Sequence, residues 1–445
     1  MKKTLSILLV ILTIFSVFFS LSGCSRKKEG IYLLNFKPES AKAYEKIAKA
    51  YEKETGIPVK VVTAAANTYE QTLKSEVAKN DAPTIFQVNG PIGYQSWKDY
   101  CADLTDTKLY SMLNDKTLAI KNGGKAYAIP YVVEGYGIIY NDAIMKKYFA
   151  LPNKKSKLSS AKEINTFEKL KEVVEDMTAN KETLGIDGVF ASTSLSGGED
   201  WRWQTHLANI PFYHEMNEKN PNADPTVAMV NAKNIDFKYS DNFKRIFDLY
   251  TDNSVTNKKL LGSKSVNDSM AEFALSKCAM VQNGTWAWSQ IKDVKGNTVA
   301  ESDIGMLPIY MGISGEENHG ICIGTENYLA VNSKVSKEKQ QMSIDFLVWL
   351  FSSDAGKKFV KEDLGFATPF NTFSEAEQPN DPLAKEMFRY MKNENVKTIP
   401  WAFAGFPSEE FKTTFGDALL QYVQGNTTFD KLKETVKNKW QSERK

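Results

Sequence analysis

The pattern of hydrophobic and polar positions predicts alternating short strands and amphipathic helices near the start of the chain. Apolar positions at helical spacing follow Ser40, a candidate N-cap, and recur after Asn67. Short apolar runs, each of the length of a buried strand, lie before and after these segments at 30–35, 56–62 and 84–88. Strands that alternate with helices in this way are typical of an α/β fold with a parallel sheet.

The same reading extends the alternation to the end of the chain. Further strands are expected at 127–130, 131–141, 189–191, 279–281, 304–308 and 321–331. Further helices are expected from residues 142 and 166 onward, and over 243–250, 270–275, 344–351, 353–360, 411–423 and 429–440. No Pro-rich linker interrupts the chain, so several strand crossings are expected to join its domains instead of one flexible tether.

The amino terminus has the order of a secretory signal. A basic head, Met1-Lys2-Lys3, precedes a nearly continuous apolar run, and small residues follow before Cys24. The ending Leu21-Ser22-Gly23-Cys24 resembles a bacterial lipobox, which implies that Cys24 carries a lipid. We therefore expect a lipoprotein signal peptide at 1–23, a hydrophilic tether at 24–29, and a protein anchored to the outer face of a bacterial cell membrane. A plain signal peptide with a chance cysteine is the alternative.

Composition is that of a soluble globular protein behind this anchor. Hydrophobic residues make up 42%, charged residues 25%, and the net charge is +2. The near balance of charge argues against nucleic acid as the main partner. A mature chain of about 420 residues exceeds the size of one hydrophobic core, so two lobes are expected. Aromatic residues reach 12%, which suits a ligand that is bound by stacking on ring faces.

Cysteine and histidine give no indication of a metal site or of a cofactor. Besides Cys24 the chain has Cys101, Cys278 and Cys322, without the spacing of a metal site, and their pairing is left open. The three histidines match no zinc pattern. No metal and no cofactor are therefore expected.

Aromatic side chains follow short strands and glycines in several places. In the stretch from Cys278 to Trp288, an apolar run leads to the turn residues Asn283 and Gly284, and then to Trp286 and Trp288. A Gly-rich segment at 194–200 leads in the same way to two further tryptophans. Either set can be core packing, but their repetition favours a ligand site. The stacking candidates are Trp201, Trp203, Trp286 and Trp401.

Polar candidates lie at expected strand ends and bends, where α/β proteins bind ligands. Asn35, Glu39 and Asn89 follow the first and third strands. Glu134 and Tyr136 lie in a Gly-rich segment between apolar runs, and Glu326 and Asn327 lie at a bend. With the residues of the Trp loops, the candidate ligand-binding set is Asn35, Glu39, Asn89, Glu134, Tyr136, Trp201, Trp203, Gln204, Asn283, Gly284, Trp286, Glu326, Asn327 and Trp401. A surface salt bridge is the alternative for each acidic member.

The chain resembles the extracellular solute-binding proteins of sugar ABC importers, of the maltodextrin-binding type. The resemblance rests on segments that recur in order over nearly the whole mature chain. Besides the lipobox, they are 44–59, 81–86, 125–130, 137–141, 279–286, 346–350 and 356–359. It implies a two-lobe, periplasmic-binding-protein-like α/β fold with a hinge and a ligand cleft between the lobes. The expected lobes are 30–140 plus 298–351 and 141–297 plus 352–445.

The resemblance also implies a non-catalytic, monomeric protein that delivers a sugar to an ABC importer permease. The aromatic of the family's Gly-x-Trp element corresponds to Trp286, and Gly284 is expected to leave room for a sugar ring. The segment Gly324-Thr325-Glu326-Asn327 departs from the family's Gly-Gly-rich form. The number of stacking candidates favours a di- to tetrasaccharide. The alternatives are an exported lipoprotein enzyme acting on glycans, and a binding protein for a peptide or polyamine.

Overall fold

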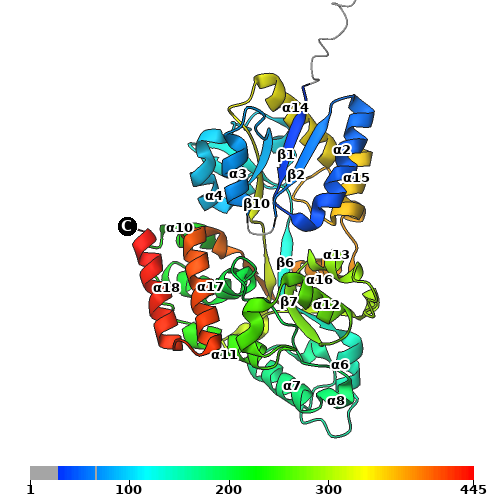
Figure 1. Ribbon diagram of the computed structural model, residues 1–445, viewed down its shortest axis with the longest axis vertical. Coiled ribbons are helices and arrows are strands. Elements are labelled where there is room, and N and C mark those ends of the chain that lie inside the picture. Colours follow the sequence, from blue (N-terminus) through cyan, green and yellow to red (C-terminus); the bar gives the residue numbers. More distant parts are fainter. Residues whose placement is uncertain (1–28, 66–67, 445) are drawn as a thin grey trace, which may run out of the picture.

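The computed structural model describes residues 29–65 and 68–444. Two lobes stack along its long axis, each built around its own β-sheet (Figure 1). The two-lobe α/β fold expected from the sequence is thereby confirmed. The predicted signal peptide, Cys24 and most of the predicted tether lie outside the described residues. Among the described helices, none is long and apolar enough to cross a membrane.

The first lobe contains a six-stranded sheet in the order β2-β1-β3-β10-β5-β4. Its strands are β1 (Ile31–Asn35), β2 (Val59–Thr63), β3 (Ile85–Asn89), β4 (Ile120–Asn122), β5 (Lys125–Pro130) and β10 (Asn327–Val331). Its helices are α2 (Ala41–Thr55), α3 (Tyr69–Val77), α4 (Gly90–Trp97), α5 (Lys108–Ser111), α14 (Lys337–Ser352) and α15 (Asp354–Phe359). β1 pairs in parallel with β2 and β3, as the alternation of the first segments predicts.

The second lobe contains a sheet in the order β11-β9-β6-β7, with β8 also paired to β6. Its strands are β6 (Glu134–Asn141), β7 (Met280–Gly284), β8 (Ile304–Leu307), β9 (His319–Gly324) and β11 (Lys397–Pro400). Its helices are α6 (Asp142–Phe149), α7 (Phe167–Ala179), α8 (Lys181–Leu184), α9 (Ala208–Lys219), α10 (Pro225–Asn231), α11 (Ser240–Asp252), α12 (Val266–Ala274), α13 (Ala287–Lys292), α16 (Pro382–Met391), α17 (Glu409–Gln424) and α18 (Phe429–Glu443). A π-helix, η5 (Arg202–Leu207), leads into α9.

The strands β1, β6, β7 and β10 are buried on both faces of their sheets, whereas the edge strands β2 and β4 are partly exposed. In β1, Ile31 and Leu33 belong to one hydrophobic cluster and Tyr32 and Leu34 to another. The strands of the second lobe alternate in the same way between two clusters. Because both faces pack against other elements, the buried strands contain short apolar runs, and the sequence shows them by these runs.

Within the described residues the chain passes between the lobes three times: between β5 and β6, between β9 and β10, and between α15 and α16. Val133, in the first passage, forms a bridge with Ala367 in the third. The lobe limits expected at residues 140 and 298 differ from the observed sheets, because β6 pairs with both β8 and β9 in the second lobe. The apolar segment 321–331 is not one bent strand but two strands, one in each sheet.

Two other expectations differ from the structure. Residues 189–191 do not form a strand; Phe190 makes isolated bridges to Ser254 and Met280. The segment carrying Trp201 and Trp203 is helical where the sequence suggested a loop, since it ends in η5.

Candidate functional site

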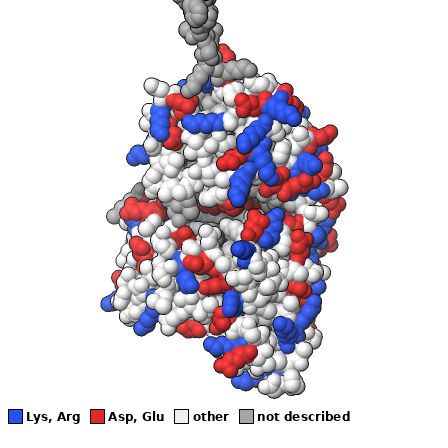
Figure 2. Space-filling model, turned by 45° about the vertical axis from the view of Figure 1, so that its right-hand side comes forward, with Lys and Arg blue, Asp and Glu red and all other residues white. Residues whose placement is uncertain are grey.

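The candidate site lies where the two lobes face each other. The carboxyl ends of β1 and β3 and the start of β10 form its first-lobe side, with Asn89 paired in register with Asn327. The end of β7, η5 and the segment after β11 form its second-lobe side. The boundary between the lobes is visible as a groove across the face in Figure 2, with acidic side chains along it.

The two lobes touch beside this groove. Gly90, the first residue of α4, adopts a φ of +61°, and a Cβ placed on it would lie 3.1 Å from the Cβ of Ala404 in the second lobe. The glycine therefore serves two purposes: it permits a left-handed backbone and a close approach of the lobes.

An aromatic cluster surrounds His206 on the second-lobe side. The imidazole stacks on Tyr136 with a centroid distance of 4.2 Å and an interplanar angle of 8°. Trp201, Trp286 and Trp401 lie 4.8, 5.5 and 5.9 Å from the same ring. Trp201 and Trp286 are the partly exposed tryptophans of the group, so they offer ring surface to the groove. Burial, with Arg202 nearby, lowers the pKa of His206 well below its ordinary value, so the ring is neutral at pH 7.

Gly284 is explained by Trp286 itself. A Cβ on Gly284 would lie 2.2 Å from the six-membered ring of Trp286, which folds back over the end of β7. The sequence suggested that Gly284 leaves room for a sugar ring, but the ring of Trp286 fills this space. Only glycine at this position lets the indole take up this orientation.

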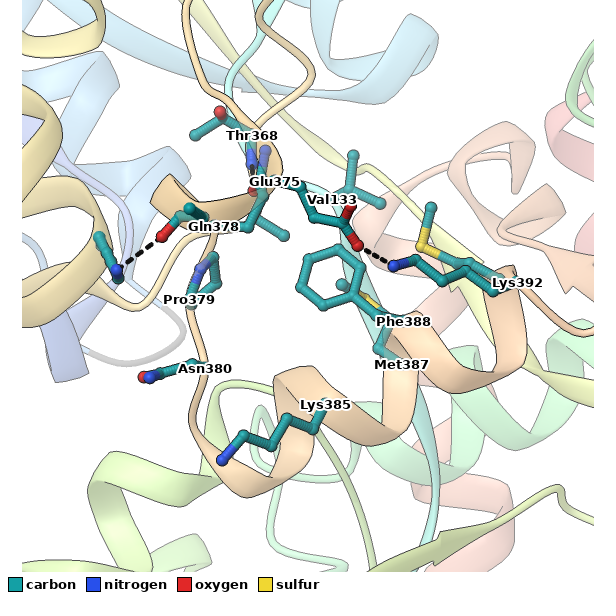
Figure 3. A pocket seen from close by; sticks show the side chains of 14 residues that line it. Val133, Thr368, Glu375, Gln378, Pro379, Asn380, Lys385, Met387, Phe388 and Lys392 are labelled. Atoms are coloured by element: carbon teal, nitrogen blue, oxygen red, sulfur yellow. Dashed lines mark hydrogen bonds and ion pairs between the residues drawn. The ribbon is translucent and has the colours of Figure 1, made fainter.

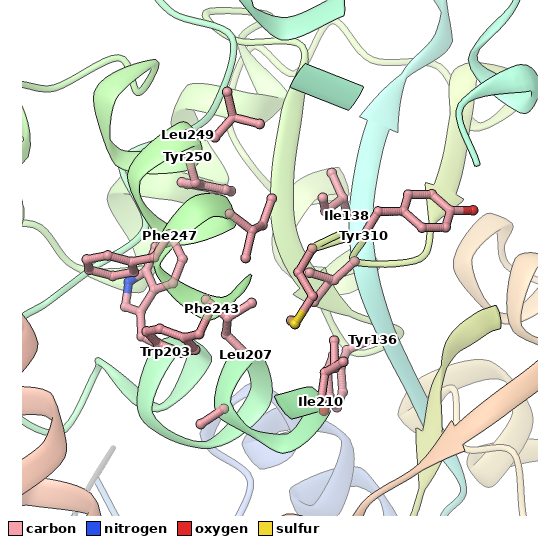
Figure 4. Close-up of a cluster of buried hydrophobic side chains, with 14 of the residues drawn as sticks. Tyr136, Ile138, Trp203, Leu207, Ile210, Phe243, Phe247, Leu249, Tyr250 and Tyr310 are labelled. Atoms are coloured by element: carbon pink, nitrogen blue, oxygen red, sulfur yellow. The ribbon is translucent and has the colours of Figure 1, made fainter. Parts of the chain in front are cut away.

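Trp203 belongs to the core of the second lobe instead of the groove. Its ring is fully buried, with centroids 5.1 Å from Phe247 and 4.9 Å from Tyr250 (Figure 4). Trp288 is also buried, on the other face of the same sheet. One tryptophan of each predicted pair thus packs in the core, while Trp201 and Trp286 lie beside the groove 5.9 Å apart.

A buried ion pair connects the lobes at the base of the groove. Nζ of Lys37, in the loop after β1, donates to both carboxylate oxygens of Glu134 at 2.9 Å, and it lies 3.8 Å from Glu39. Burial by itself lowers the pKa of Lys37, but the two carboxylates raise it above its ordinary value, so the ammonium is charged. Both carboxylate oxygens of Glu134 are therefore bonded to Lys37, and Glu39 is the more accessible of the two carboxylates.

Asn35 supports this pair and is not open to the groove. It is fully buried, its Nδ2 donates to the carbonyl of Lys37 at 2.7 Å, and its Oδ1 accepts from the Lys37 amide at 3.0 Å. The asparagine thus fixes the loop that carries the ammonium group, in the manner of an Asx turn.

A second set of charges joins the lobes at the passage between β9 and β10. Nζ of Lys412, in α17, lies 2.8 Å from Glu409 and 3.9 Å from Glu326. The carbonyl of Glu326 accepts from the amide of Gly90 at 2.8 Å. Burial raises the pKa of Glu326, although Lys412 opposes that shift.

Several buried polar atoms around the groove have no hydrogen-bond partner. Buried polar atoms are almost always paired in folded proteins, so such a group marks a place where another molecule can bind. Among the described residues near the groove, these atoms are Oδ1 of Asn89, Nε and Nη1 of Arg202, Oε1 of Gln204, Nδ1 of His206, Oδ1 of Asn327 and Nε1 of Trp401. They come from both lobes.

Comparison with known proteins establishes the family. The profile described as "bacterial extracellular solute-binding protein" matches residues 46–386. The chain belongs to this family. Its members bind solutes and do not catalyse reactions, so the alternative of an exported enzyme is set aside.

The relatives of this solute-binding protein include curated sugar-binding proteins. It is 31% identical over 150 residues to the melibiose/raffinose/stachyose-binding protein MelE of Bacillus subtilis, a match that spans 33% of this chain and 35% of MelE. It is 24% identical over 385 residues to the multiple sugar-binding protein of Streptococcus mutans, with 82% of each chain covered. The structure of RafE in complex with raffinose is similar in fold, with a TM-score of 0.70, 18% identity, and coverage of 94% of this chain and 100% of RafE.

The solute-binding protein has a further cavity beside the passages between the lobes (Figure 3). It has a volume of about 560 Å³ and lies between α16 and the segment before it; Val133, Thr368, Pro379, Met387 and Phe388 are among its lining residues. Val133 faces this cavity while the next residue, Glu134, contacts Lys37. Since successive residues of an extended segment point to opposite sides, the cavity and the groove lie on opposite sides of the passage.

Lys37, Arg202, His206 and Lys412 are residues of the site that sequence reasoning missed. Lys37 and Lys412 appear in the sequence as ordinary lysines of a loop and a helix, and only their burial against carboxylates distinguishes them. Arg202 and His206 lie next to predicted candidates, but η5 brings them to the groove. π-Helical turns are rare and frequent at functional sites, yet their sequence signal is weak.

Substitution of Lys37 by Met should lower the free energy of unfolding by about 3–5 kcal/mol, because it leaves the buried carboxylate of Glu134 without its partner. The double variant Lys37→Met/Glu134→Met should recover most of this loss, since it removes both buried charges. Chemical denaturation of the three proteins measures the effect.

Lys46→Met is the matched control, because it removes an exposed ion pair with Asp363 and should change stability by about 1 kcal/mol or less. A loss in the double variant as large as that in Lys37→Met would contradict the pairing.

Proposed function

We propose that this solute-binding protein binds a di- to tetrasaccharide between its lobes and delivers it to the permease of an ABC importer. The observation that carries the proposal is the combination of two partly exposed tryptophan faces, Trp201 and Trp286, with unpartnered buried polar atoms from both lobes. The proposal is supported by the similarity to MelE, a melibiose/raffinose/stachyose-binding protein, and to the structure of RafE in complex with raffinose.

The chemistry of a pyranose matches these two kinds of group. One face of the sugar ring carries C–H groups and stacks on an indole, while its rim carries hydroxyls that both donate and accept hydrogen bonds. Trp201 and Trp286 supply ring surfaces, whereas Trp401 is buried against Trp286 and contributes its unpartnered Nε1. The polar members proposed to contact hydroxyls are Glu39, Asn89, Gln204, Glu326 and Asn327.

The remaining predicted residues shape this site without facing the ligand. Asn35 and Glu134 hold Lys37. The hydroxyl of Tyr136 donates to the carbonyl of His206 at 3.0 Å, and Asn283 accepts from Arg202. Gly284 accommodates Trp286, and Trp203 stabilises the core behind η5.

Closure of the lobes is the proposed signal to the permease, and the lipid on Cys24 is the proposed anchor at the membrane. The three passages between the lobes allow a hinge, a known device in binding proteins. The contact of Gly90 with Ala404 and the approach of Lys412 to Glu326 join opposite lobes, so both depend on the closed arrangement.

Calorimetry of the purified protein against a panel of neutral oligosaccharides tests the proposal. We expect saturable binding of a di- to tetrasaccharide, and no stabilisation by polyamines or short peptides in a parallel thermal-shift screen. Binding of a polyamine or peptide in place of every sugar would overturn the proposed ligand class. Hydrolysis of a bound oligosaccharide would contradict a purely binding role.

Trp286→Ala should weaken binding of the selected sugar by about 1 kcal/mol or more, because it removes a stacking face at the scale of a hot-spot residue. Trp349→Ala is the matched control: this partly exposed tryptophan packs on Tyr51, on the outer side of the first lobe. Titration calorimetry compares the two. Equal affinities for the parent and Trp286→Ala would remove Trp286 from the site.

Ala404→Leu should hold the lobes apart, because the larger side chain meets Gly90 at the point of contact between them. Overpacking of this kind costs about 1–3 kcal/mol, so affinity should fall about tenfold. X-ray scattering at saturating sugar should give a larger radius of gyration than for the parent. Ala179→Leu, the same change on an exposed helix end, is the control; an equally compact Ala404→Leu complex would refute the role of this contact.

A further inference from the structure

Arg202 is a buried cation that has no carboxylate in ion-pair contact within the part of the chain that the structure describes. Its side chain is 1% exposed, and its guanidinium carbon lies 4.0 Å from the centre of the Trp201 ring. One nitrogen, Nη2, donates to Oδ1 of Asn283 at 3.3 Å, while Nε and Nη1 have no hydrogen-bond partner among the residues described. The arginine ion pairs of the described residues involve Arg245 and Arg389 instead.

The other buried cations of the groove are each neutralised. Lys37 contacts Glu134 and Glu39, and Lys412 contacts Glu409. A charge that is taken out of water without a partner destabilises the folded protein, and proteins retain such a group where it acts on something else. Arg202 differs from these two lysines, because its buried charge has no carboxylate in ion-pair contact among the described residues.

Arg202 adjoins the aromatic cluster of the proposed ligand site. Trp201, on which it stacks, is in ring contact with His206 and Trp286. Nε and Nη1 carry three of the five guanidinium N–H groups. Nη2 has a second N–H besides the one that it donates to Asn283, so Nη2 together with Nε or Nη1 can hold two neighbouring oxygens along one edge of the planar group. A lysine would present a single point charge in place of this fixed plane.

We infer that Arg202 selects the ligand by donating hydrogen bonds to two adjacent oxygens, either vicinal hydroxyls of a neutral sugar or the carboxylate of a uronic acid unit. This inference rests on the proposed binding of a saccharide. The stacking faces accept many sugars, since every pyranose has an apolar face, whereas the guanidinium requires oxygens in a particular arrangement. Arg202 is thus a specificity-determining residue for the ligand.

The test compares Arg202→Met and Arg202→Lys with the parent, in melting temperature without ligand and in affinity for matched neutral and uronate-containing oligosaccharides. Arg202→Met keeps the apolar stem on Trp201 and removes the buried charge, so its melting temperature should rise by about 2–4 °C. Its affinity should fall about tenfold or more, the scale of a charged hydrogen bond. Arg202→Lys should lose affinity as well, without the rise in melting temperature.

Arg245→Met is the matched control, because Arg245 also lies over an aromatic ring, that of Phe167, but pairs with Glu168 on the surface. Its affinity should equal that of the parent. Preference of the parent for a neutral sugar indicates vicinal hydroxyls as the acceptors; preference for the uronate, weakened by salt, indicates a carboxylate.

Affinity of Arg202→Met within about twofold of the parent would overturn the inference and leave sugar binding intact. If no saccharide binds the parent, the proposed function fails, and the melting temperature still decides the role of Arg202. A lower melting temperature in Arg202→Met would show that the guanidinium stabilises the fold and would overturn the inference. A higher melting temperature in Arg202→Met would support the inference that the guanidinium is kept for hydrogen bonding to a ligand.

Discussion

The buried ion pair between Lys37 and Glu134 is the interaction on which the relation of the two lobes depends. Its ammonium comes from the loop after β1 in the first sheet, and its carboxylate from the first residue of β6 in the second. Because a buried charge is stable only with its partner, the pair fixes the loop against the first passage between the lobes. Two residues further along β6, Tyr136 supports His206 and with it the aromatic cluster.

The rest of the candidate site includes groups that the fold holds in place but leaves without hydrogen-bond partners among the described residues. The tryptophans are oriented by the glycine at the end of β7 and by the π-helix, while polar atoms from both lobes lack partners. A fold optimised for stability alone would pair or remove these groups. Their presence between two lobes, at the ends of strands and in η5, is the physical basis of the proposed ligand site.

Much of the fold could be predicted from the sequence, because several of its strands are buried on both faces and stand out as apolar runs. The elements of β1, α2, β2 and β3 and the helices α11, α17 and α18 lie where the pattern places them. The lobe limits could not be predicted, since pairing of β6 with β8 and β9 leaves no local signal. The same holds for residues 189–191, where distant partners decide against a strand.

For the site, the sequence by itself determined the type of chemistry: aromatic side chains after glycines, and amides and carboxylates at strand ends. The tertiary structure decided which members meet. Trp203 is indistinguishable from Trp201 in sequence but packs against Phe247 and Tyr250, and the space beside Gly284 belongs to Trp286. Lys37 and Arg202 gain their importance only from burial. Local pattern determines which residues lie at the end of a strand, but burial and charge pairing depend on segments far apart in the chain, and these are set only by the packing of both lobes.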